Sequence, residues 1–65
     1  MSYENFCKRA NAAAERNGAF IKGFENDEDA GKFIAYCSDG TSIIGNSTSL
    51  KCTFRFNGRQ YMGIL

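Results

Sequence analysis

The apolar residues of this chain change their spacing once, at Gly18, and that change restricts the fold more than any other feature. Before Gly18 they recur at the spacing of one helix face: Tyr3, Phe6, Cys7, Ala10, Ala13 and Ala14. After Gly18 they alternate with a period of two, which is typical of strands. The sequence therefore predicts one amphipathic helix followed by a sheet.

The helix is expected at about residues 2–17. Ser2 belongs to the residue types that favour the N-cap position, and Asn17-Gly18 supplies the left-handed conformation that often ends a helix. The charged residues fall away from the apolar stripe: Glu4, Lys8, Arg9, Glu15 and Arg16. Their mixed signs favour a solvated helix face.

Three segments after the helix predict strands. The segment AFIKGFE, residues 19–25, predicts a first strand with Phe20, Lys22 and Phe24 on one side and Ala19, Ile21 and Gly23 on the other. Residues 32–46 predict two strands around Asp39-Gly40, a dipeptide favoured in type I′ turns. Residues 50–65 predict a closing hairpin at Asn57-Gly58, the strongest hairpin signal in the chain.

No stretch is long enough to act as a linker between domains. Residues 1–65 are therefore expected to form a single α+β domain, with one helix packed on an antiparallel sheet of four or five strands. A chain of this length buries only about 60% of the surface that its unfolded form exposes, so the core must be thin.

A two-residue turn at Asn57-Gly58 pairs residues 56 with 59, 54 with 61, 52 with 63 and 50 with 65. One face of this hairpin then carries Leu50, Cys52, Phe54, Phe56, Tyr61 and Leu65, with Arg59 near the turn. The other carries Lys51, Thr53, Arg55, Gln60, Met62 and Ile64. In the middle hairpin the expected faces are Phe33, Ala35, Cys37 and Ile44 against Ile34, Tyr36 and Ile43. Because one helix covers one face, a mixed apolar and basic face is expected to remain uncovered.

Catalysis and metal binding have little support in the residue types present. Histidine, the side chain most often used in acid–base catalysis, is absent. Cys7, Cys37 and Cys52 are an odd number of cysteines at spacings that fit neither a disulfide framework nor a zinc knuckle. We expect three reduced thiols, with one disulfide and a free thiol as the alternative, and no enzyme activity, cofactor or metal.

The charge balance of +1 argues against a strong attraction to nucleic acids or anionic membranes. No apolar run approaches the ~20 residues of a membrane span. The amino-terminal residues also lack the apolar core of a signal peptide. The protein is therefore expected in the cytoplasm, without membrane association.

An acidic segment, Glu25, Asn26, Asp27, Glu28 and Asp29, is expected to form a loop after the first strand. A solvated turn is the favoured interpretation. A contact surface for a basic partner, made by Glu25, Asp27, Glu28 and Asp29, is the alternative. A third interpretation, a weak cation site, rests only on Asp27, Asp29 and Gly31, which match a fragment of a calcium loop.

Two functional hypotheses follow from the uncovered face. The first is binding to another protein, or to a protein–nucleic acid complex, through residues of the types enriched in protein interfaces and their neighbours: Tyr36, Lys51, Arg55, Gln60, Met62 and Ile64. The alternative is direct binding of nucleic acid, because Lys51, Arg55 and Arg59 lie near aromatic residues. Against it, aromatic and basic residues between 50 and 56 fall on opposite faces.

Two further alternatives concern how the uncovered face is hidden. A homodimer could form by stacking sheets or pairing an edge, or the strands could curl into a small barrel that buries both faces in part. In size and composition, without histidine or a catalytic constellation, the chain is similar to small phage or mobile-element proteins that block a host machine, including inhibitors of defence systems. That similarity implies an inhibitor or adaptor role.

Overall fold

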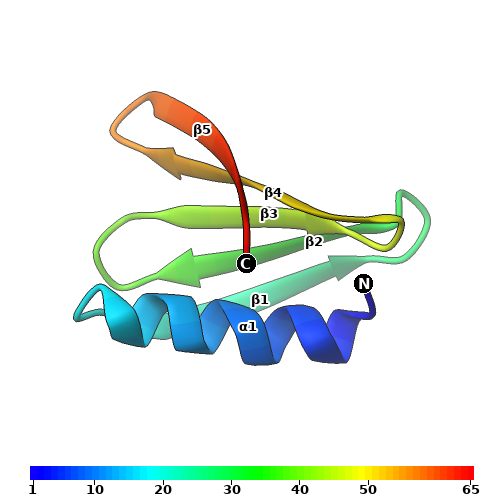
Figure 1. Ribbon diagram of the computed structural model, residues 1–65, viewed down its shortest axis with the longest axis horizontal. Helices are drawn as coiled ribbons and strands as arrows, with labels where there is room; N and C mark the ends of the chain where they lie inside the picture. Colours follow the sequence, from blue (N-terminus) through cyan, green and yellow to red (C-terminus); the bar gives the residue numbers. More distant parts are fainter.

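The computed structural model describes residues 1–65 as one helix packed on a five-stranded antiparallel sheet (Figure 1). The elements are α1 (Tyr3–Arg16), β1 (Ile21–Asp27), β2 (Lys32–Cys37), β3 (Ser42–Asn46), β4 (Ser49–Phe56) and β5 (Arg59–Ile64). Each strand pairs with its neighbours in sequence, so β1 and β5 form the two edges of the sheet. The α+β fold predicted from the sequence is confirmed.

Local capping sets the ends of α1. The Ser2 hydroxyl accepts a hydrogen bond of 3.1 Å from the backbone N–H of Asn5, which satisfies one of the free donors in the first turn. Asn17 is the C-cap, and Gly18 follows with a φ of 71°, a conformation that glycine adopts without steric cost. The helix therefore begins and ends within a residue of the predicted bounds.

The core lies between α1 and the first strands and is built from few large side chains. Its buried members are Phe6, Ala10, Ala13, Ala14, Phe33, Ala35, Cys37, Ile43 and Cys52. The Phe6 ring packs against Phe33 at 5.4 Å and Phe24 at 6.4 Å between centroids. Alanines on α1 let the helix backbone approach the sheet closely, as expected for a small core.

The hairpin between β4 and β5 forms as predicted. Asn57 and Gly58 both have positive φ, at 50° and 76°, as a type I′ turn requires. The register pairs Phe56 with Arg59, Phe54 with Tyr61 and Cys52 with Gly63. Leu65 lies beyond the end of β5, so the expected pairing of residues 50 and 65 is replaced by a ladder that ends at Lys51 and Ile64.

The hairpin between β2 and β3 differs from the prediction by one residue. Ala35 pairs with Ile43 and Ile34 with Ile44, because Cys37 and Thr41 close the loop by a hydrogen bond and leave three residues between them instead of two. Cys37 N–H donates to the Thr41 carbonyl at 2.8 Å, and Gly40 has a φ of 91°. A shift of one residue exchanges the faces of a strand, so Ile43 is in the core and Ile44 is on the opposite side.

The predicted faces of the first strand are wrong, because β1 contains a bulge. Ile21 pairs with Cys37 but Gly23 pairs with Tyr36, which leaves Lys22 as the extra residue. Ile21 and Phe24 therefore both pack against the core, although simple alternation placed them on opposite sides.

The predicted acidic loop is also shorter than expected. Strand β1 continues through Glu25 and Asn26 to Asp27, so only Glu28 and Asp29 of the acidic segment lie in the turn before β2.

Helix α1 lies over β1, β2 and β3 and leaves the β4–β5 hairpin uncovered (Figure 1). The sheet curls, and the end of β5 returns toward the helix, where Arg9 Nη1 donates a hydrogen bond of 2.8 Å to the Leu65 carbonyl. The curl stops short of the closed barrel left as an alternative, because β1 and β5 do not pair. Five of the seven exposed large apolar side chains consequently belong to β4 or β5.

Candidate interaction surface

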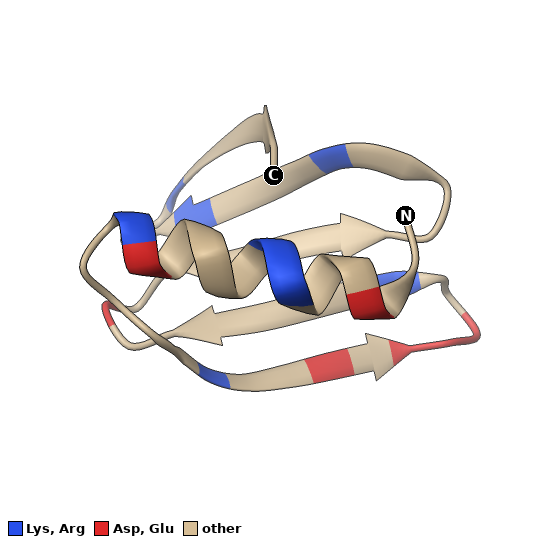
Figure 2. Ribbon diagram, turned by 60° about the horizontal axis from the view of Figure 1, so that its bottom comes forward, with Lys and Arg blue, Asp and Glu red and all other residues tan.

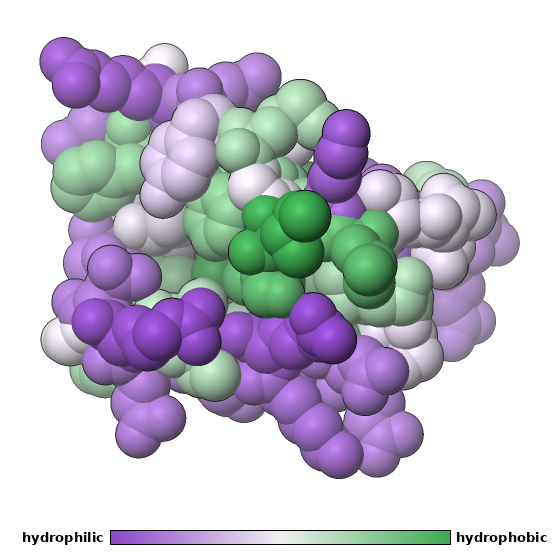
Figure 3. All heavy atoms as spheres, viewed as in Figure 1, coloured by the Kyte–Doolittle hydropathy of each residue, from purple (hydrophilic) through white to green (hydrophobic).

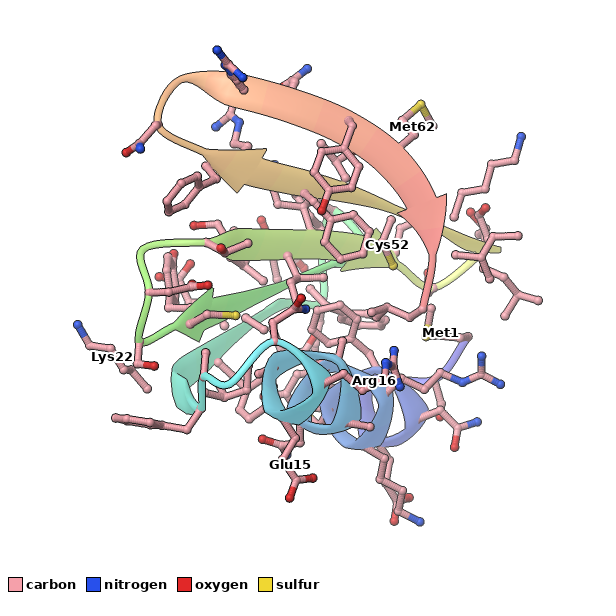
Figure 4. All side chains as sticks on the ribbon, turned by 60° about the vertical axis from the view of Figure 1, so that its left-hand side comes forward. Met1, Glu15, Arg16, Lys22, Cys52 and Met62 are labelled. Carbon is pink, nitrogen blue, oxygen red and sulfur yellow. The ribbon has the colours of Figure 1, made fainter.

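The strand register places the six predicted contact residues on one face of the sheet, the face turned away from α1, here called the open face. Tyr36 pairs with Ser42, Ser42 with Arg55 and Arg55 with Gln60, which forms one row across four strands. Met62 pairs with Thr53, and Ile64 with Lys51. Figure 4 shows Met62 directed away from the helix, whereas Cys52 on the neighbouring strand points toward it. Residues separated in the sequence are thus neighbours on the open face.

A second row on the open face is apolar except for Thr53. Ile34, Ile44, Thr53 and Met62 are successive partners across β2, β3, β4 and β5. Ile34 and Ile44 are half-buried by their neighbours, whereas Met62 and Ile64 are each 69% exposed. An apolar strip flanked by polar side chains is the arrangement found at the centre of protein interfaces.

Two hydrogen bonds hold polar side chains of the open face in place. The Tyr36 hydroxyl donates to Glu25 Oε1 at 2.9 Å, and Arg55 Nε donates to Gln60 Oε1 at 3.2 Å. The bond to Glu25 is the main reason that the pKa of Tyr36 lies above its ordinary value, with desolvation and the charge of Glu25 adding to it. Side chains held in this way lose less conformational entropy when a partner binds than freely rotating side chains would.

Charge is distributed unevenly over the open face. Lys51 and Arg55 make the β4 side basic, whereas Glu25 and Asp27 make the β1 edge acidic. Figure 2 shows the acidic positions along β1 and its following turn, separate from the basic positions of β4. The predicted acidic contact residues Glu25 and Asp27 therefore belong to the same face as the basic ones.

The remaining acidic residues, Glu28 and Asp29, lie in the exposed turn that follows β1. The turn is stabilised locally by the N–H of Ala30, which donates to Asp27 Oδ1 at 3.2 Å. No group of three or more histidine, cysteine or acidic side chains is close enough to hold a metal ion. A carboxylate that accepts from a backbone N–H three residues later is typical of a polar turn.

The three cysteines are free thiols in this structure. Cys37 and Cys52 are buried and Cys7 is half-buried. Burial raises the pKa of the Cys37 thiol, and the nearby Asp39 carboxylate raises it further. Burial also raises the pKa of Cys52. Thiols of this kind are poor nucleophiles because little thiolate is present at neutral pH.

The side of the β4–β5 hairpin that faces α1 is more open than the sequence suggests. Phe54 packs against the core as predicted, but Phe56 and Tyr61 are 43% and 64% exposed. A helix about 10 Å wide covers only two or three strands at a spacing of about 4.8 Å. That comparison of widths, applied to the four or five predicted strands, is the signal that would have indicated an uncovered aromatic region beside the helix.

Comparison of the chain with protein-family models, with curated protein sequences and with solved structures finds no match. Helix α1 has neither the length nor the apolar character needed to cross a membrane.

Proposed function

We propose that this protein is a small non-enzymatic binding module that attaches to another protein through the open face of its sheet. The observation that supports the proposal is the row of Ile34, Ile44, Thr53 and Met62, a mainly apolar row on which no helix packs. Exposed apolar strips of this kind on small domains commonly mark interaction sites. Tyr36 and Arg55, residue types enriched at interface centres, flank the row on the same face.

The charges of the open face define the partner's chemistry. Near Lys51 and Arg55 the partner should present acidic or carbonyl groups, and opposite Ile34, Ile44 and Met62 it should present apolar side chains. Binding by one face, without a catalytic site, acts by blocking or bridging the partner, which is the role of an inhibitor or adaptor. The similarity in size and composition to small phage and mobile-element proteins supports the inhibitor role.

A protein partner is favoured over a nucleic acid because the stacking groups and the basic groups are on different sides of the sheet. Phe54, Phe56 and Tyr61 lie on the side that faces α1, whereas Lys51 and Arg55 lie on the open face. Tyr36 is the one aromatic residue that the five strands present on the open face, and its hydroxyl donates to Glu25. Single-strand binders instead combine stacking platforms with a basic groove.

Capture experiments with matched variants test the proposal. Tagged protein immobilised in lysate of its source cells should retain a stoichiometric protein, and Met62→Glu should abolish retention because it places a charge in the apolar row. Leu50→Glu is the control, since Leu50 is also exposed, at 52%, but shares the side of buried Cys52 in β4 and therefore lies opposite the open face. Equal retention by both variants would exclude the open face as the contact surface.

The same samples separate the alternative partners. Nuclease treatment should abolish retention if the partner is a nucleic acid. In that case single-stranded oligonucleotides should bind in a salt-sensitive manner, and Arg55→Ala should weaken their binding. Light scattering over a concentration series detects a second copy of the chain as the occupant. A dimer that Met62→Glu dissociates would show that the open face, or the β5 edge beside it, serves self-association instead.

A further inference from the structure

A groove of about 320 Å³ lies between the carboxyl half of α1 and the inner side of β4 and β5, on the opposite side of the sheet from the open face. Its lining residues are Ala13, Ala14, Asn17, Ala19, Cys37, Asp39, Thr41, Ile43, Phe54, Phe56 and Tyr61. Figure 3 shows apolar atoms gathered between the helix and the hairpin, with polar atoms around them. The volume falls at the lower end of the range of small-molecule sites, roughly 300–1,000 Å³.

Aromatic rings form one wall of the groove. Phe54 and Tyr61 stack with centroids 5.1 Å apart and an interplanar angle of 11°. The Phe56 ring lies against the turn between β2 and β3, where its Cε2 is 3.8 Å from the position of a Cβ atom on Gly40. Small side chains, Ala13 and Ala14, form the opposite wall. A ligand in the groove therefore meets ring surfaces on one side and a smooth helix surface on the other.

The one charged group that lines the groove is negative. Asp39 is the single charged side chain in the lining, and no lysine or arginine belongs to it. The Thr41 N–H donates to Asp39 Oδ1 at 2.9 Å. This bond and the Thr41 hydroxyl hold the pKa of Asp39 below its ordinary value, so the carboxylate is ionised at neutral pH.

The carboxyl end of α1 adds to that charge. Asn17, the C-cap of α1, also lines the groove, and the carboxyl end of a helix bears a partial negative charge. Figure 2 shows the acidic position of the β2–β3 turn close to this end of α1. Arg16 in the last turn of α1 offsets part of this charge, so Asp39 is the main source of negative potential beside the aromatic wall.

We propose that this groove binds a small organic cation with an apolar body, of the alkylammonium class and about the size of choline. The aromatic wall of Phe54, Phe56 and Tyr61 attracts such a cation through the ring quadrupoles, and Asp39 supplies the counter-charge. The apolar substituents fill the space beside Ala13 and Ala14. An anionic ligand would be repelled, and a neutral apolar ligand would leave Asp39 and the helix end unused.

The test is an NMR titration of ¹⁵N-labelled protein with choline and with its neutral isostere 3,3-dimethylbutan-1-ol, at constant ionic strength. Choline is expected to shift the amides of Thr41, Ile43 and Tyr61 and to bind about five-fold tighter or more than the isostere. Asp39→Asn retains an acceptor for the Thr41 N–H but removes the negative charge. Its affinity for choline should therefore fall to the affinity that wild type has for the isostere. Tyr61→Leu should weaken choline binding, whereas Met62→Leu, on the opposite face of the same strand, should not.

Equal affinity for choline and the isostere, or full choline affinity in Asp39→Asn, would overturn the proposal. Absence of shifts with choline in the folded wild-type protein would overturn it as well. Much tighter binding of a lysine-containing peptide than of choline would also overturn it, because the ligand would then be a lysine side chain of a partner protein and not a free small cation. Met62→Glu alters only the open face, so this variant should bind choline with the affinity of wild type even if it no longer binds the protein partner. The two proposals can therefore fail independently.

Discussion

The ring of Phe6 occupies the space that a side chain on Gly45 would need. A Cβ atom placed on Gly45 would lie 2.8 Å from both Cδ1 and Cε1 of the Phe6 ring, which is fully buried. Carbon atoms do not approach so closely without displacement. The contact between α1 and β3 therefore depends on a glycine at this position of the strand.

Gly45→Ala should destabilise the domain by about 1–3 kcal/mol, because the Phe6 ring must move within a packed core. Gly23→Ala is the matched control, since Gly23 also lies in a strand but a Cβ atom there would meet nothing within 4 Å. Chemical denaturation of both variants measures the difference. Equal stability of the two would show that the helix is not held against β3 as described.

Titration of Tyr36 tests the hydrogen bond to Glu25. Its raised pKa means that the bond stabilises the fold below about pH 10, the ordinary tyrosine pKa, and that this contribution is lost as the pH rises through the higher value in the folded protein. Residue-specific NMR should show Tyr36 titrating above its ordinary value, and Glu25→Gln should lower its pKa. Glu15→Gln, which changes an exposed carboxylate of α1, should leave it unaltered. An unchanged Tyr36 pKa in Glu25→Gln would contradict the contact.

Thiol reactivity should follow burial. In the native protein a thiol reagent should modify Cys7 first, and Cys37 and Cys52 only as fast as the structure opens, because both are buried and have raised pKa values. Mass spectrometry over time, with Cys7→Ser as the control, resolves the order. Rapid modification of Cys52 in the folded protein would be inconsistent with its position in the core.

The features that the sequence predicted well are those set by local chemistry. Ser2 and Asn17-Gly18 mark the ends of α1, and Asn57-Gly58 determines both the turn and the register of the last hairpin. Because that register was predictable, so was the grouping of Lys51, Arg55, Met62 and Ile64 on one face.

The features that the sequence did not predict depend on competing local solutions or on tertiary packing. Asp39-Gly40 fits a two-residue loop as well as the three-residue loop that forms, and the choice exchanges Ile43 and Ile44. The bulge at Lys22 has no signal in the spacing of apolar residues. The aromatic groove depends on how far the sheet curls beyond the width of α1, which no local pattern specifies.

The affinity of the captured partner for three purified proteins tests the role of the open face most directly. Wild type and Leu50→Glu should bind equally, and Met62→Glu should bind at least about ten-fold more weakly, since a charge in the apolar row costs more than about 1.4 kcal/mol. Circular dichroism should show all three to be equally folded. Equal affinity of Met62→Glu and wild type, with both folded, would contradict binding through the open face.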